Sequence, residues 1–135
     1  MSGPLSPLLA TAALAVLLAS GCGDGPPTHT TIAIRYSRFT PEAVTVPTGV
    51  PVTITLRNDD PIDHEWIVGP PEVHERHRSG KEPFHAELPN EVTVPGLSTR
   101  VTTLTFEQAG EYAYICHLPG HESYGMVGTL RVVER

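Results

Sequence analysis

The chain has 135 residues, a formal net charge of −6, and 14 Pro and 12 Gly residues. This length fits one ordinary domain plus a short leader. No Lys, Arg, Asp or Glu precedes Asp24, so the charge lies entirely on the part of the chain that follows the leader. An acidic domain without a basic patch argues against nucleic acid as a partner, and the many turn-forming residues favour short strands over long helices.

Residues 1–21 carry no charged side chain and include an apolar run from Leu8 to Leu18. The run is too short to span a bilayer and is typical of the core of a signal peptide. It ends in Leu18-Ala19-Ser20-Gly21-Cys22, which resembles the bacterial lipoprotein signal and implies lipid attachment at Cys22. We therefore expect an extracytoplasmic protein, anchored through Cys22 at the outer face of the membrane or in the periplasm. Plain secretion after cleavage and a retained leader anchor are the alternatives.

Residues 22–29 have the Gly/Pro-rich composition of a flexible tether, and residues 30–135 form the expected domain. Within that domain, apolar residues alternate with polar ones in short runs that end at Gly, Pro, Asn or Asp, which is the pattern of half-buried strands. The pattern predicts an all-β Greek-key sandwich of seven to eight strands. The expected strands are residues 30–36, 43–46, 50–56, 64–68, 91–94, 99–107, 111–116 and 128–133.

Residues 69–90 form a long polar insert without strand periodicity, in which residues 72–78 could make one or two helical turns. The insert contains His74, His77 and His85. One interpretation is a second metal site for zinc or copper, because His74 and His77 would share a helical face. The other is a passive, solvated loop. Two His residues at this spacing supply only half a site, which favours the passive loop.

The stretch that carries the clearest chemistry contains Cys116, His121 and Met126, with four residues between each and the next. A thiolate, an imidazole and a thioether suit copper better than zinc, calcium or magnesium. A site of this type needs a second His, and His64 is the candidate. Taken alone, a Cys on an inward strand face is usually a small hydrophobic residue, but the three residues at this spacing favour a metal site. A disulfide with Cys22 is disfavoured because the leader explains that residue.

The segments Gly110-Glu111-Tyr112-Ala113-Tyr114-Ile115-Cys116, Pro119-Gly120-His121 and Gly125-Met126-Val127-Gly128 resemble the copper loop of the cupredoxins. These are small blue-copper proteins such as plastocyanin, azurin and rusticyanin. The upstream segments 39–46 and 58–64 are also similar to the family. The resemblance covers about residues 30–133. It implies one copper ion per chain, bound by His64, Cys116 and His121, with Met126 as the axial ligand.

The same resemblance implies an electron carrier, not an enzyme, that serves unidentified redox partner proteins. It places the ring edge of His121 in an apolar surface patch, for which Leu118, Pro119 and Tyr124 are candidates. Copper sequestration or delivery is the alternative function. An enzyme domain is disfavoured because the sequence shows neither a second domain, whose His residues would let His117 bridge to a second copper, nor the paired Cys of a binuclear copper centre. One departure concerns Glu65, which follows His64 where the family often has an Asn or Ser that ties the ligand loops together.

Overall fold

The computed structural model describes residue 3 and residues 25–135. The expected signal peptide (apart from Gly3), Cys22 and the first part of the expected tether lie outside the described residues. Within the described part of the chain, no helix is both long enough and apolar enough to cross a bilayer.

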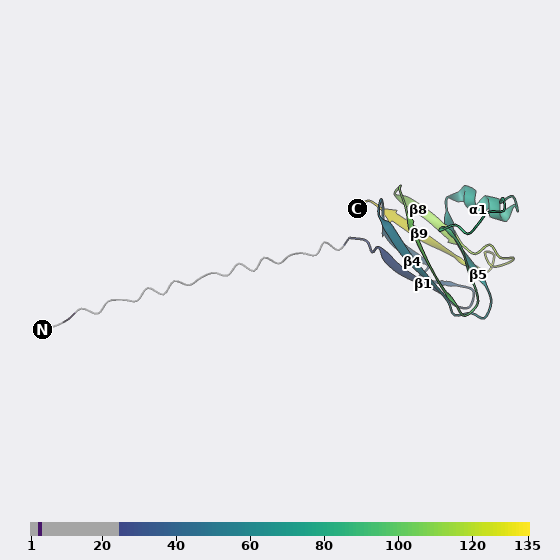
Figure 1. The fold of residues 1–135 in the computed structure, drawn as a ribbon, viewed down its shortest axis with the longest axis horizontal. Coiled ribbons are helices and arrows are strands. Elements are labelled where there is room, and N and C mark those ends of the chain that lie inside the picture. Colours follow the sequence, from purple (N-terminus) through teal and green to yellow (C-terminus); the bar gives the residue numbers. More distant parts are fainter. Residues whose placement is uncertain (1–2, 4–24) are drawn as a thin grey trace.

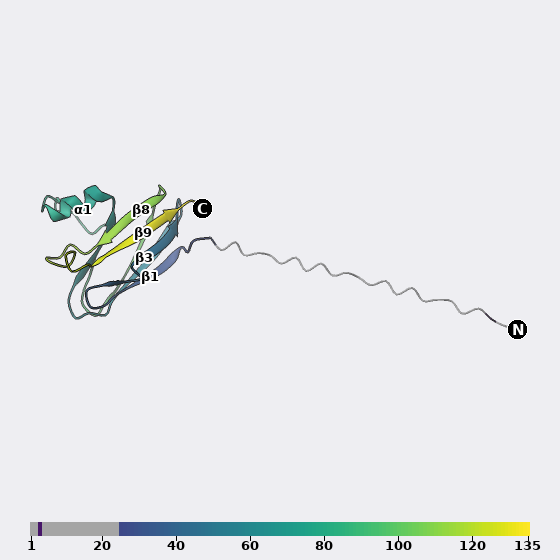
Figure 2. The same cartoon turned by 180° about the vertical axis from the view of Figure 1, so that it is seen from behind.

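The described domain is a sandwich of two mixed β-sheets, with one short helix beside it (Figures 1 and 2). One sheet has the strand order β2-β1-β4-β7, and the other has the order β3-β9-β8-β5-β6. The elements are β1 (His29–Ile34), β2 (Phe39–Thr40), β3 (Ala43–Pro47), β4 (Pro51–Asn58), β5 (His64–Gly69), α1 (Pro71–Arg78), β6 (Glu91–Val94), β7 (Thr99–Thr105), β8 (Gly110–Ile115) and β9 (Val127–Val133).

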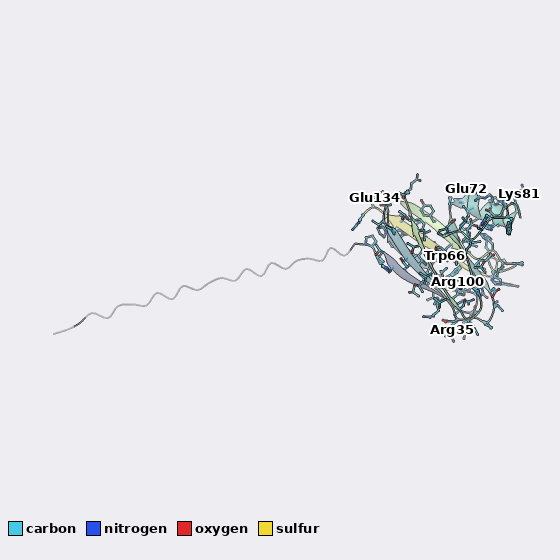
Figure 3. All side chains as sticks on the ribbon, viewed as in Figure 1. Arg35, Trp66, Glu72, Lys81, Arg100 and Glu134 are labelled. Atoms are coloured by element: carbon cyan, nitrogen blue, oxygen red, sulfur yellow. The ribbon has the colours of Figure 1, made fainter. Side chains whose placement is uncertain are left out.

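The core lies between the sheets and is built from the alternating residues that the sequence pattern marks as apolar. In β4, Val52, Ile54 and Leu56 are fully buried, while the residues between them are more exposed. β4 pairs antiparallel with β7 and parallel with β1. Trp66 of β5 is also fully buried, and Figure 3 shows it among the strands, with Arg35 and Glu72 at the periphery. Burying apolar side chains of this size stabilises the fold by about 1.5–3 kcal/mol each before entropy is counted.

The predicted all-β sandwich is confirmed, although the described domain has nine strands where seven to eight were expected. The additional strand is β2, which lies between the expected strands 30–36 and 43–46, and it forms because Phe39 is buried and pairs with Ile34 of β1. The insert contains α1, which starts at Pro71, one residue before the predicted helical turns. Pro is favoured at this position because the first helical residue needs no hydrogen-bonded backbone N–H.

Strand order in the second sheet determines where the candidate ligands meet. β8 lies between β5 and β9, and Ile115 pairs with Ile67 on one side and with Val127 on the other. The start of β5, the end of β8 and the start of β9 therefore converge at one end of the sandwich. His64, Cys116 and Met126 occupy or adjoin those three strand ends.

Candidate metal centre

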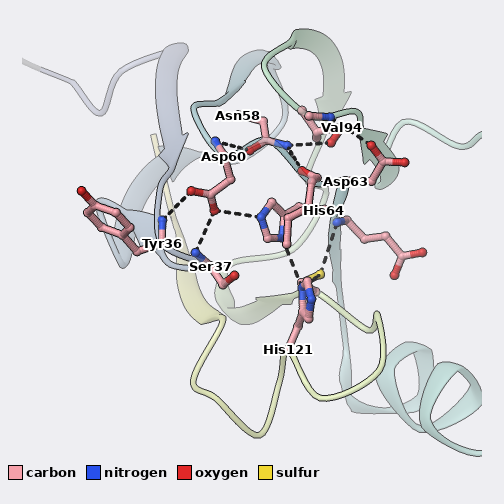
Figure 4. A network of polar contacts seen from close by, with 12 residues as sticks. Tyr36, Ser37, Asn58, Asp60, Asp63, His64, Val94 and His121 are labelled. Atoms are coloured by element: carbon pink, nitrogen blue, oxygen red, sulfur yellow. Dashed lines mark hydrogen bonds and ion pairs between the residues drawn. The ribbon is translucent and has the colours of Figure 1, made fainter.

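Three side-chain donors converge at this end of the sandwich (Figure 4). His121 Nδ1 lies 3.2 Å from His64 Nδ1 and 3.2 Å from Cys116 Sγ, and all three atoms lie within 4.8 Å of one another. Metal–nitrogen and metal–sulfur bonds of about 2.0–2.3 Å would place donors in a trigonal plane roughly 3.5–4 Å apart. The three atoms can thus bind one ion with little rearrangement. His64 and Cys116 are fully buried and His121 is half-buried.

His64 is oriented through its other ring nitrogen. Its Nε2–H donates to Asp60 Oδ2 at 2.9 Å, which leaves the Nδ1 lone pair directed at the site. A carboxylate behind a ligating imidazole fixes the tautomer and ring orientation and raises ligand basicity. Burial lowers the pKa of His64, although the hydrogen bond to Asp60 opposes that effect. The imidazole is therefore neutral near pH 7, as metal binding requires.

Asp60 is itself fixed by backbone groups. Its two carboxylate oxygens accept hydrogen bonds from the N–H groups of Tyr36 at 2.7 Å and Ser37 at 2.8 Å. Burial opposes ionisation, but these bonds and the one from His64 outweigh it and lower the pKa of Asp60. Tyr36 and Ser37 both have positive φ, a conformation that non-Gly residues adopt only when their surroundings hold them there. The β1–β2 turn thus supports a ligand from β5.

Cys116 is buried among apolar side chains, and this burial raises the pKa of its thiol. The Glu65 N–H donates to Cys116 Sγ at 3.3 Å and favours the thiolate. Since the thiol is protonated at neutral pH without a metal, binding must release a proton. Glu65 stands where the family often has an Asn or Ser that links the ligand loops. Here the backbone N–H of Glu65 links the segment of His64 to Cys116, and any residue at this position could supply that N–H.

Met126 is fully buried and is part of the core between the sheets. Its backbone ties the ends of the loop together, since Met126 N–H donates to His121 O and Met126 O accepts from Cys116 N–H. Between His121 and Met126, Gly125 has φ +89°, and a Cβ there would meet the guanidinium of Arg38. The loop that carries Cys116, His121 and Met126 therefore has a defined conformation.

The insert histidines divide between two surroundings. His117 Nε2–H donates to His74 Nδ1 at 2.9 Å, and His74 Nε2–H donates to Ala113 O at 3.2 Å. Burial, with His74 nearby, lowers the pKa of His117 to about 4, so this pair is neutral. The His77 ring stacks on the His117 ring with centroids 5.2 Å apart, and His85 Nε2 lies 2.9 Å from Glu91 Oε2. His74 is thus paired with His117, and His85 with Glu91.

Sequence reasoning missed the part that Asp60 plays at this site. The signal that could have revealed it is its position four residues before His64. The sequence pattern otherwise indicates only that a strand ends in this loop. It also missed the ion pair between Arg78 of α1 and Glu122, 2.6 Å between Nη2 and Oε1, which ties the insert to the metal-binding loop.

Comparisons with known proteins agree with this fold. A cupredoxin-like domain model matches residues 8–132. The chain is 30% identical to the copper-resistant cuproprotein CopI of Rubrivivax gelatinosus over 117 residues, which cover 82% of this chain and 70% of that protein. Auracyanin A from Chloroflexus aurantiacus, described as a "blue" copper protein, is 28% identical, with a TM-score of 0.61 over 81% of this chain and all of that one. A dithionite-reduced auracyanin from Roseiflexus castenholzii has a TM-score of 0.68 at 23% identity, covering 81% and 99%.

The fold and the matched residues define the class of protein: this chain belongs to the cupredoxin-like family. It is a copper-binding or electron-transfer protein of that family, as the resemblance of its Cys116–Met126 loop predicts.

Proposed function

We propose that this protein is an extracytoplasmic blue-copper electron carrier, without enzymatic activity, that transfers one electron through a mononuclear type 1 site. The observation that carries the proposal is the preformed donor set, in which His64 Nδ1, His121 Nδ1 and Cys116 Sγ already face one another. A site held rigid before the metal arrives must rearrange little when the metal changes charge. This favours repeated electron transfer.

Each residue has a distinct part in this proposal. His64, Cys116 and His121 would hold one copper ion, and the buried Met126 would supply a weaker thioether ligand. Copper supplies the exchange between Cu(I) and Cu(II). Asp60 keeps the His64 ring in one orientation, and the Glu65 N–H hydrogen bond stabilises negative charge on the Cys116 sulfur.

The protein surface near the site suits contact with a redox partner protein. The ring of His121 is half-buried, so it is the ligand nearest to solvent. The two ligand loops expose large hydrophobic side chains: Tyr124, three residues after His121, is 71% accessible, and Ile62, two residues before His64, is 49% accessible. Exposed apolar side chains beside a functional site are typical of docking surfaces. We infer that the electron enters and leaves through His121 while a partner covers these side chains.

Repeated reduction and reoxidation of the copper-loaded protein tests this function. We expect reversible one-electron voltammetry, and a visible spectrum that returns to its starting intensity over many cycles with copper retained. Copper loss within the first cycles, or slow and irreversible reduction, would contradict an electron carrier.

Copper sequestration or delivery is the second candidate, favoured by the 30% identity to a protein named for copper resistance. The two functions differ in how readily the metal leaves. A delivery protein would transfer Cu(I) quickly to an acceptor protein or chelator in the reduced state, whereas the carrier would keep it.

The leader motivates a prediction about location. If Cys22 is lipidated, the protein made in a bacterial host will fractionate with membranes, and its mature N-terminus will carry diacylglycerol by mass spectrometry. Cys22→Ala should release the chain from the membrane fraction without changing its visible spectrum. A native mature chain that lacks the lipid would show that Leu18 to Cys22 does not act as a lipoprotein signal.

A further inference from the structure

A second group of ligand-type side chains lies outside the copper site, beside the β5–β6 pair. It consists of His77 from α1, Glu82 and His85 from the segment that follows, and Glu91 from β6. We refer to these four residues as the insert cluster. They come together only because the insert folds back over the outer face of the sheet, where a cavity of about 350 Å³ is lined in part by His77, His85 and Glu91.

The atoms of the insert cluster face one another as electron-pair donors. His85 Nδ1–H donates to the carbonyl of Ala86 at 2.7 Å, so in the neutral ring Nε2 carries the lone pair. That Nε2 lies 2.9 Å from Glu91 Oε2 and 3.3 Å from Glu82 Oε1. His77 Nε2 lies 3.5 Å from the same Glu91 oxygen. Donors this close repel one another unless a cation lies between them.

Burial of Glu91 increases the cost of leaving these donors without a cation. The Glu91 side chain is only 7% exposed, and among residues 25–135 neither its Oε2 atom nor His77 Nε2 has a hydrogen-bond partner. His85 Nε2 lies 2.9 Å from this oxygen and can donate to it only when His85 is protonated, because the proton of the neutral ring is on Nδ1. A buried carboxylate oxygen without a partner is unfavourable, and coordination to a metal ion would satisfy it together with His77.

We propose that the insert cluster binds one divalent transition-metal ion, Zn²⁺ or Cu²⁺, through His77, His85, Glu82 and Glu91. Two imidazoles and two carboxylates are a donor set that suits these ions, whereas Mg²⁺ and Ca²⁺ prefer oxygen ligands alone. His77, Glu82 and Glu91 each offer an atom within 4.8 Å of the others, which is compatible with a shared ion.

Neighbouring contacts hold two of these ligands in place. The His77 ring stacks on His117 with an interplanar angle of 5°, which fixes its plane. Arg76 Nε donates to Glu82 Oε2 at 2.8 Å, which leaves Oε1 for the cluster. The site differs from the trio His74, His77 and His85 suggested by the sequence, because His74 is hydrogen-bonded to His117 and the carboxylates take its place.

A proton is the competing cation. The hydrogen bond to Ala86, with the nearby charges of Glu91 and Glu82, raises the pKa of His85. Without metal, a protonated His85 would form ion pairs with both carboxylates. A bound metal ion must displace that proton, so this competition lowers metal affinity as pH falls.

The test is titration with Zn²⁺, and separately Cu²⁺, of the full protein already loaded with copper at the coloured site, with stoichiometry read by native mass spectrometry. We expect one further equivalent of metal and an unchanged visible band. Glu91→Gln and His85→Asn should each weaken Zn²⁺ binding by more than about 100-fold. Losing a residue that only hydrogen-bonds to a ligand costs at most about 100-fold, so a larger loss indicates direct ligands. His29→Asn is the matched control, because His29 is exposed and distant in sequence from the cluster. Mg²⁺ should not compete.

The opposite result is equally definite. The proposal would be overturned if no additional equivalent of metal binds, or if binding survives both Glu91→Gln and His85→Asn. The insert cluster would then be a set of ion pairs between a protonated His85 and the two carboxylates. Glu82→Gln serves as a further variant if either substitution lowers the melting temperature. This test is independent of the proposed electron-transfer function. If the protein holds no coloured copper, the metal-free chain should still lose one Zn²⁺ equivalent on Glu91→Gln and none on His29→Asn.

Discussion

Cys116→Ser is expected to abolish the intense visible absorption of the oxidised, copper-loaded protein. The colour of such a site needs a thiolate bonded to Cu(II), and Cys116 supplies the only sulfur among the three convergent donors. A Ser hydroxyl is a harder donor that does not replace the soft thiolate. Visible spectroscopy at matched copper content measures the effect, and we expect less than roughly a tenth of the parent intensity because the thiolate ligand is gone.

Met126→Leu is the matched control, because Met126 is as fully buried as Cys116 and lies in the same loop. Leu keeps the volume within the range that cores tolerate, at less than about 1.5 kcal/mol. The variant should still bind copper and keep its colour, since three strong ligands remain. Its reduction potential should rise, because losing the thioether destabilises Cu(II) relative to Cu(I). A coloured Cys116→Ser protein, or a Met126→Leu protein that binds no copper, would contradict the ligand assignment.

The features that the sequence predicts well are local ones. Cys116, His121 and Met126 fall within one short loop, so their spacing alone nearly determines that they can meet. The buried residues of β4 alternate as the pattern of Val52, Ile54 and Leu56 predicts. The helix in the insert could also be expected, because Pro at its start and Arg, His and Arg in its last turn are consistent with helix ends.

Other features depend on contacts between distant segments and leave no periodic signal. The parallel pairing of β3 with β9 joins Val44 to Leu130, and nothing in either strand specifies the partner. The support of Asp60 by the Tyr36 and Ser37 N–H groups requires the loops before β2 and β5 to meet. The insert cluster likewise needs the chain after α1 to fold back onto Glu91.

Gly128 is a position where the sequence indicates that glycine is required but does not reveal which contact requires it. Its place after Met126 suggests tight backbone around a metal. In the structure it faces Tyr114 across the β8–β9 pair, and a Cβ at Gly128 would clash with the Tyr114 ring. That ring is fully buried, packs edge-on against Phe39 with centroids 5.2 Å apart, and donates its hydroxyl to Pro41 O at 2.7 Å. Burial and these two contacts restrict its movement.

Gly128→Ala should therefore destabilise the domain strongly, by about 3 kcal/mol, the upper range for overpacking a core. For a domain of this size that corresponds to a melting temperature about 10 °C lower. Thermal unfolding of the metal-free protein measures the effect, with Gly25→Ala as the control because a Cβ there meets nothing within 4 Å. In a Tyr114→Leu background the clash with the ring disappears, so adding Gly128→Ala should cost less than about 1 kcal/mol. This coupling identifies the contact itself as the cause, and equal costs in both backgrounds would contradict it.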